Sequence, residues 1–92
     1  MKTNTSINTQ EAQRIAKRLL NHWKHKFEVS ENDQLMSIFM PEATVEMHIH
    51  PDHLEVVLAT EKEDYQHLQK VIIDHLDRMA QQQFEVTWSA PH

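Results

Sequence analysis

Two long segments of the chain, residues 8–26 and 60–82, repeat hydrophobic residues at the spacing of an α-helix. The positions on the apolar side are Ala12, Ile15, Ala16, Leu19, Leu20 and Trp23 in the first segment, and Tyr65, Leu68, Val71, Ile72, His75, Leu76 and Met79 in the second. Each segment opens with the spacing of a capping box, formed by Asn8 and Glu11 and by Thr60 and Glu63. The pattern therefore predicts two amphipathic helices.

Alternation of apolar and polar residues predicts β-strands in the rest of the chain. It is clearest at residues 44–50, where one side carries Val45, Met47 and Ile49 and the other carries Thr44, Glu46, His48 and His50. Pro51-Asp52-His53 then predicts a tight turn, because proline presets the backbone of its first corner. The apolar side resumes at Leu54, Val56 and Leu58, and shorter strands are expected at residues 3–7, 27–30, 35–40 and 84–88.

This order of elements predicts a single α+β domain over residues 1–92. Two helices on one face of an antiparallel sheet of four to five strands bury both apolar stripes, which gives a two-layer sandwich. The other face of the sheet is then left without a helix.

That uncovered face is expected to carry an interface. The strand at residues 35–40 is apolar on both sides, and Leu35, Phe39 and Val57 point away from the helices. An exposed apolar sheet surface usually marks a contact with another molecule. The sequence therefore predicts a homodimer, or a docked protein partner, at these three residues.

Composition removes several function classes. The chain has no cysteine and no glycine, which excludes disulfides, thiolate chemistry and the glycine-rich loops that cradle phosphates. Residues 1–26 carry a net charge of +5, so the remainder carries −10, and this acidic remainder would repel a nucleic acid. No apolar run reaches the roughly 20 residues of a membrane helix, and no secretory signal is present. We therefore expect a cytoplasmic protein with no nucleic-acid or membrane partner.

The segment MHIHPDH, residues 47–53, is a candidate metal site. His48 and His50 lie two residues apart on a strand and point to the same side, where Glu46 could add a carboxylate for zinc or nickel. Ligands from one strand point in nearly parallel directions, however, and rarely complete a tetrahedron. The alternative is that these histidines are solvated on an exposed strand.

A second group of histidines lies on the predicted helices. His22 and His25 are near the end of the first helix, and His75 lies on the apolar side of the second. If the helices lie side by side, His22 or His25 approaches His75, as in metal or haem sites built from separate elements. The alternative is a core histidine satisfied by one hydrogen bond.

Catalysis is not expected, because no nucleophile stands beside a base and no carboxylate falls within an apolar stripe. Asp74 and His75 are the best candidate dyad, but adjacent residues of a helix point about 100° apart. A small enzyme that uses His22 and His75 is the third hypothesis, after a binding module and an interaction domain.

Five stretches in order, HWKHKFEV, IFMPEATVEMHIH, PDHLEVVLAT, VIIDHLDRMA and FEVTW, resemble the bacterial family named domain of unknown function 2218, over about residues 3–88. The resemblance implies a variant of the TATA-binding-protein or phosphohexomutase C-terminal fold. The family pattern is carried here by His22, Trp23, His25 and Lys26, and by His75, Leu76 and Arg78. The chain departs from the family at Pro51-Asp52-His53, where relatives commonly have proline-aspartate-glycine, and at Ala43, where glycine is usual.

The resemblance also implies an accessory role in iron and siderophore utilisation, beside flavin-dependent siderophore-interacting reductases. An anionic ferric siderophore, or the propionates of haem, would be drawn to the basic end of the first helix, which carries Arg18. The expected ligand-binding residues are His22, His25, Lys26, His75 and Arg78. No resident cofactor is expected, with haem or a divalent metal as the alternatives.

Overall fold

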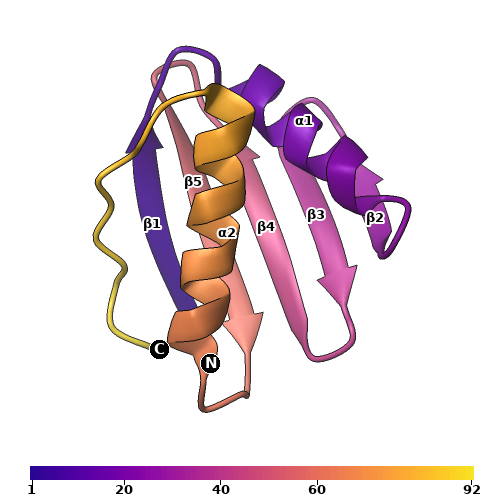
Figure 1. Cartoon of the computed structure of the whole chain (residues 1–92), viewed down its shortest axis with the longest axis vertical. Coiled ribbons are helices and arrows are strands. Elements are labelled where there is room, and N and C mark those ends of the chain that lie inside the picture. The colour runs from indigo at the N-terminus through magenta and orange to yellow at the C-terminus, as the bar shows by residue number, and fades with distance from the viewer.

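Two helices cover one face of a five-stranded antiparallel sheet in the computed structural model, which describes residues 1–92 (Figure 1). The strands are β1 (Lys2–Asn8), β2 (Glu28–Glu31), β3 (Leu35–Met40), β4 (Ala43–Ile49) and β5 (His53–Thr60), and the helices are α1 (Ala12–Trp23) and α2 (Tyr65–Ala80). The strand order is β1-β5-β4-β3-β2. The predicted α+β architecture is confirmed. Neither helix is long and apolar enough to cross a membrane.

The core lies between the helices and the sheet. The buried side of α1 includes Ile15, Leu19 and Leu20, each at most 2% exposed. Every second residue of β4 and β5 faces these helices, as the alternation predicts. Buried aliphatic side chains of this kind each contribute about 1.5–3 kcal/mol to stability, so the two layers are held mainly by this contact.

Both helices begin later than their capping pairs predict. Asn8 and Thr60 are the last residues of β1 and β5, so neither is free to cap a helix. The Oγ1 of Thr60 donates a hydrogen bond to the carbonyl of Glu42 and accepts one from the N–H of Lys62. The residues that precede the helices, Glu11 and Asp64, make no side-chain capping bond. Both capping-box predictions are therefore wrong.

The predicted last strand is also wrong, although the segment lies where a sixth strand would pair. Residues 83–92 run along the outer edge of β1 (Figure 1), with backbone hydrogen bonds in both directions between Lys2 and His92. Ser89 donates its N–H to the carbonyl of Asn4. The N–H of Asn4 instead donates to the side-chain oxygen of Ser89, which interrupts the regular ladder. We call residues 83–92 the terminal segment.

Gln81 ends α2 in a left-handed conformation, with φ 58° and ψ 38°. It is the one residue of this glycine-free chain with a positive φ. A side chain in this conformation costs about 1 kcal/mol relative to glycine. We expect Gln81→Gly to raise the free energy of unfolding by about 1 kcal/mol in a urea titration.

The matched control for that substitution is Gln82→Gly. Gln82 is exposed like Gln81 but does not have a positive φ. It is expected to bring no gain, because glycine there only adds freedom to the unfolded chain. Equal urea midpoints for the two variants would contradict the prediction.

Candidate functional site

The junction of the two helices brings together side chains that are far apart in the sequence. The ring centroids of His22, on α1, and His75, on α2, lie 5.4 Å apart with an angle of 49° between the rings. Trp23 lies beside both, with its centroid 4.8 Å from that of His75 and 6.4 Å from that of His22. One turn earlier on α1, the guanidinium of Arg18 donates to the carbonyl of Met79 at 3.0 Å. The side-by-side placement of the helices therefore produces the expected contact between His22 and His75.

The three aromatic side chains of this junction differ in exposure. Trp23 is buried at 7% exposed and also packs edge-on against Phe27, at a centroid distance of 6.2 Å. His75 is half-buried, and its Nδ1 lies 2.8 Å from the carbonyl oxygen of Val71. His22 is exposed. The junction is therefore a surface site with an indole beneath it. We call His22, Trp23 and His75 the junction cluster.

The other predicted ligand-binding residues surround the junction cluster without joining it. His25 and Lys26 are exposed in the turn after α1, where the Lys26 ammonium lies 5.4 Å from the centroid of the Phe27 ring. Arg78 is exposed one turn after His75 on α2. The structure thus brings two of the five predicted residues into contact.

The basic side chains around the junction cluster are not neutralised. Lys24, Lys26, Arg18 and Arg78 form no ion pair with any carboxylate of the chain. An anion that approaches this surface therefore meets free positive charge rather than existing salt bridges.

The candidate dyad of Asp74 and His75 does not form. The carboxylate of Asp74 is paired with Lys70 at 3.0 Å, and the Nδ1 of His75 is held by a backbone carbonyl. His75 is therefore not oriented by Asp74 as a general base would be, although the two residues are adjacent in the sequence.

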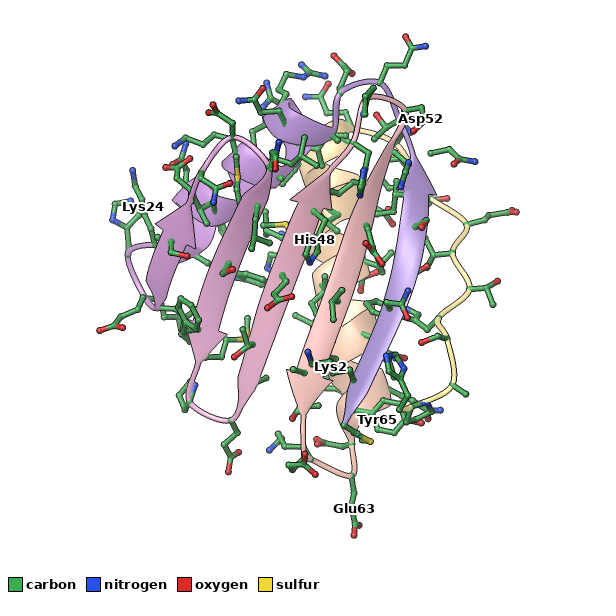
Figure 2. The ribbon with its side chains drawn as sticks, turned by 180° about the vertical axis from the view of Figure 1, so that it is seen from behind. Lys2, Lys24, His48, Asp52, Glu63 and Tyr65 are labelled. Atoms are coloured by element: carbon green, nitrogen blue, oxygen red, sulfur yellow. The ribbon has the colours of Figure 1, made fainter.

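Of the histidines of residues 47–53, His48 lies in the middle of the uncovered sheet face (Figure 2), whereas His50 and His53 flank the turn between β4 and β5. The Nε2 of His48 is 3.2 Å from a carboxylate oxygen of Glu46. The rings of His50 and His53 stack in parallel, 4.1 Å apart at 9°, and the Nδ1 of His53 is 2.6 Å from Asp52. No group of three or more histidine, aspartate or glutamate side chains in the protein is arranged to hold a metal ion. Metal binding by His48 and His50 stays a prediction.

The hydrogen bond with His53 lowers the pKa of Asp52 below its ordinary value of 3.8. A folded-state pKa below the unfolded one stabilises the fold above the unfolded value, and this contribution is lost as pH falls through the folded value. We therefore expect the native protein to lose slightly more stability than Asp52→Asn on acidification below about pH 4. Urea midpoints of both proteins at neutral pH and at acid pH measure this difference. Parallel pH profiles would contradict it.

The uncovered sheet face carries fewer exposed apolar side chains than the sequence pattern predicts. Phe39 is 44% exposed, whereas Leu35 and Val57 are half-buried. Strand register places polar neighbours beside all three residues, in the pairs Leu35 with His48, Phe39 with Thr44 and Val57 with Glu46. The apolar positions therefore form a mixed surface with polar residues.

A hollow that sequence reasoning missed lies at the opposite end of the sheet, between the β3–β4 turn and the end of β5. Lys62 spans it, with its ammonium 2.9 Å from Glu42 and 4.0 Å from Asp64. The hydrogen bond to Glu42 raises the pKa of Lys62 above its ordinary value. The lysine is thus committed to internal ion pairs. No local sequence pattern predicts this hollow, because its walls come from three separate segments, residues 1–2, 40–44 and 59–62.

Comparison with known proteins agrees with the fold. The family model of DUF2218, described as an uncharacterized protein conserved in bacteria, matches residues 4–89. The NMR structure of PA4090 from Pseudomonas aeruginosa is similar, with a TM-score of 0.81 and 36% sequence identity, covering 96% of this chain and 94% of that one. No curated protein matches the chain.

Proposed function

Because the chain belongs to DUF2218, an uncharacterized family conserved in bacteria, we propose its function from the site itself: it is a binding module for an anionic iron-bearing ligand. The ligand is a ferric siderophore or haem, bound in the cytoplasm at the junction cluster. The observation that carries the proposal is the contact of His22 with His75 on a surface with unpaired basic side chains. The resemblance to accessory proteins of iron and siderophore utilisation supports the choice of ligand.

Each group of the junction has a role in this binding. Carboxylates or catecholates of a siderophore, or haem propionates, are attracted by the free charges of Arg18, Lys24 and Lys26. The imidazoles of His22 and His75 offer nitrogen donors, which iron in haem accepts. A siderophore-interacting reductase is the protein partner that this role implies. The module itself binds and presents the iron and catalyses no step.

The experiment that tests this function is a titration of the purified chain with haem and with a ferric catecholate siderophore, followed by absorbance. Reversing one charge near an anion, as in Lys26→Glu, is expected to weaken binding about tenfold. The matched control is Lys70→Glu, which makes the same charge change at a lysine already paired with Asp74. Unchanged spectra with both ligands, or equal losses in the two variants, would count against the proposal.

A second candidate is a homodimer through the uncovered sheet face. The observation in its favour is the 44% exposure of Phe39, the most exposed large hydrophobic side chain of the protein. Phe39→Asp is expected to convert the dimer to a monomer in size exclusion with light scattering. Gln66→Asp, at an exposed position of α2 on the other face of the sheet, is the control for added charge alone. A native chain that elutes as a monomer at every concentration would remove this candidate.

A further inference from the structure

A hydrogen bond holds the ring of His75 in the tautomer whose Nε2 atom can bind a metal ion. Its Nδ1 lies 2.8 Å from the carbonyl oxygen of Val71, one turn earlier in α2. A carbonyl oxygen only accepts hydrogen bonds, so in the neutral ring the proton is on Nδ1 and the free lone pair is on Nε2. Metal-binding histidines are commonly fixed in this way, by donating one N–H to a backbone carbonyl.

The lone pairs of both junction histidines are accessible. The Nε2 of His75 has no hydrogen-bond partner, and the protein contains no buried side-chain nitrogen without one, so this atom reaches the surface. His22 is exposed, and neither of its ring nitrogens is hydrogen-bonded within the protein. No internal bond therefore has to break before these nitrogens bind an ion.

The separation and tilt of the two rings suit a shared ion. The lone pair of an imidazole nitrogen lies in the plane of its ring, so one ion can bind two rings where their planes meet. An ion about 2.1 Å from one nitrogen of each ring, in a tetrahedral arrangement, sets the ring centroids roughly 5 Å apart. The observed separation is 5.4 Å, and the rings are inclined by 49°.

The second histidine pair of the protein shows the contrasting geometry. The rings of His50 and His53 are nearly parallel, at 9°, and stack 4.1 Å apart. Their lone pairs lie in parallel planes and do not meet at one point. His53 is also engaged through Nδ1 with the carboxylate of Asp52. The pair that is separated by 53 positions in the sequence thus combines inclined rings with free nitrogens, whereas the pair in the histidine-rich motif has neither feature.

We infer that His22 and His75 form a two-histidine site for a divalent transition-metal ion, with water completing its coordination. Imidazole nitrogen suits Cu²⁺, Ni²⁺ and Zn²⁺, with Cu²⁺ bound most tightly, whereas Mg²⁺ and Ca²⁺ prefer oxygen and are not bound. The inference shares the contact of His22 with His75 with the proposed function but goes beyond its ligand. It concerns a bare cation held by two imidazole lone pairs, whereas the proposed function concerns an anionic iron complex that basic side chains also attract.

The test uses the full chain without a polyhistidine tag, titrated with Ni²⁺ by calorimetry and thermal melting. At a metal concentration about ten times Kd, the melting temperature is expected to rise by about 7 °C. His22→Ala and His75→Phe are each expected to weaken binding at least tenfold. Phenylalanine keeps a ring against Trp23, so loss of binding in that variant reports the missing nitrogen and not a loss of packing.

The control is His67→Ala, which removes an exposed histidine of α2 eight residues before His75 and is expected to leave Kd unchanged. In an NMR titration with Zn²⁺, the Nε2 resonance of His75 is expected to shift and those of His50 and His53 to stay in place. Retained affinity in His22→Ala and His75→Phe, or an equal loss in His67→Ala, would overturn the site.

The effect of salt separates metal binding by the two histidines from the anion binding of the proposed function. Added salt screens the basic side chains, so it weakens the binding of an anionic iron complex but relieves the repulsion of a cation. Ni²⁺ affinity is therefore expected to hold or to rise with added sodium chloride. A fall in parallel with haem or siderophore affinity would overturn the two-histidine assignment without affecting the proposed function.

Discussion

Trp23→Ala is expected to lower the free energy of unfolding by about 3–5 kcal/mol, because it leaves a large cavity where the indole packed. Trp23 ends α1, is 7% exposed and lies against Phe27 and His75. For a domain of this size, such a loss corresponds to a fall in melting temperature of about 15–30 °C. Urea unfolding followed by far-ultraviolet circular dichroism measures it independently of tryptophan fluorescence.

The control for this substitution is Trp23→Phe, which keeps an aromatic ring between the same neighbours and leaves a smaller cavity. It is expected to retain most of the stability that the alanine variant loses. The two variants also report on the site, since the indole supports the ring of His75. An alanine variant with the urea midpoint of the native chain would mean that the junction cluster does not pack on the core.

Removal of residues 84–92 is expected to destabilise the protein by about 3 kcal/mol or more and to make it self-associate. This part of the terminal segment places Phe84, Val86 and Trp88 against the core, and even half-burial of such side chains contributes about 1 kcal/mol each. It also covers the outer edge of β1 through the backbone bonds of Lys2 and Asn4. An uncovered edge strand is a template for pairing with another chain.

Light scattering during size exclusion, together with urea unfolding, measures both parts of that prediction. The full chain with Glu85→Gln is the control, because it changes an exposed residue of the same segment and keeps the edge covered. If the truncated chain keeps the native urea midpoint and the native mass at high concentration, the terminal segment does not protect the sheet.

Local sequence patterns predict an element correctly where the pairing of distant strands favours the same structure. The strand at Leu35–Met40 was predicted to the residue, since its apolar run stops at Pro41. Helix starts were not, because Asn8 and Thr60 resemble caps locally but extend β1 and β5 by pairing with distant strands. A local capping signal and a strand end share the same residue types, and only the partner strand decides between them.

The same distinction applies to the site. The contact of His22 with His75 follows from which faces of the two helices are buried and from their side-by-side packing. The hydrophobic periodicity of the sequence predicts these faces. The stack of His50 on His53 depends on the backbone of Pro51 and Asp52 and on two side-chain rotamers. The spacing of apolar residues predicts neither the backbone conformation of this turn nor these rotamers. The hydrogen bond between His75 and Val71, which fixes the tautomer of His75, could not be predicted from the sequence either. It uses a backbone carbonyl oxygen, which every residue has.

The reciprocal bonds between Lys2 and His92 bring the two ends of the polypeptide to one corner of the molecule (Figure 1). A short flexible peptide could therefore connect them into a backbone-cyclised ring. New ends could then be opened at the exposed turn of Pro41 and Glu42, between β3 and β4. Such a circular permutant would keep every strand neighbour while it changes the order in which the strands emerge during synthesis.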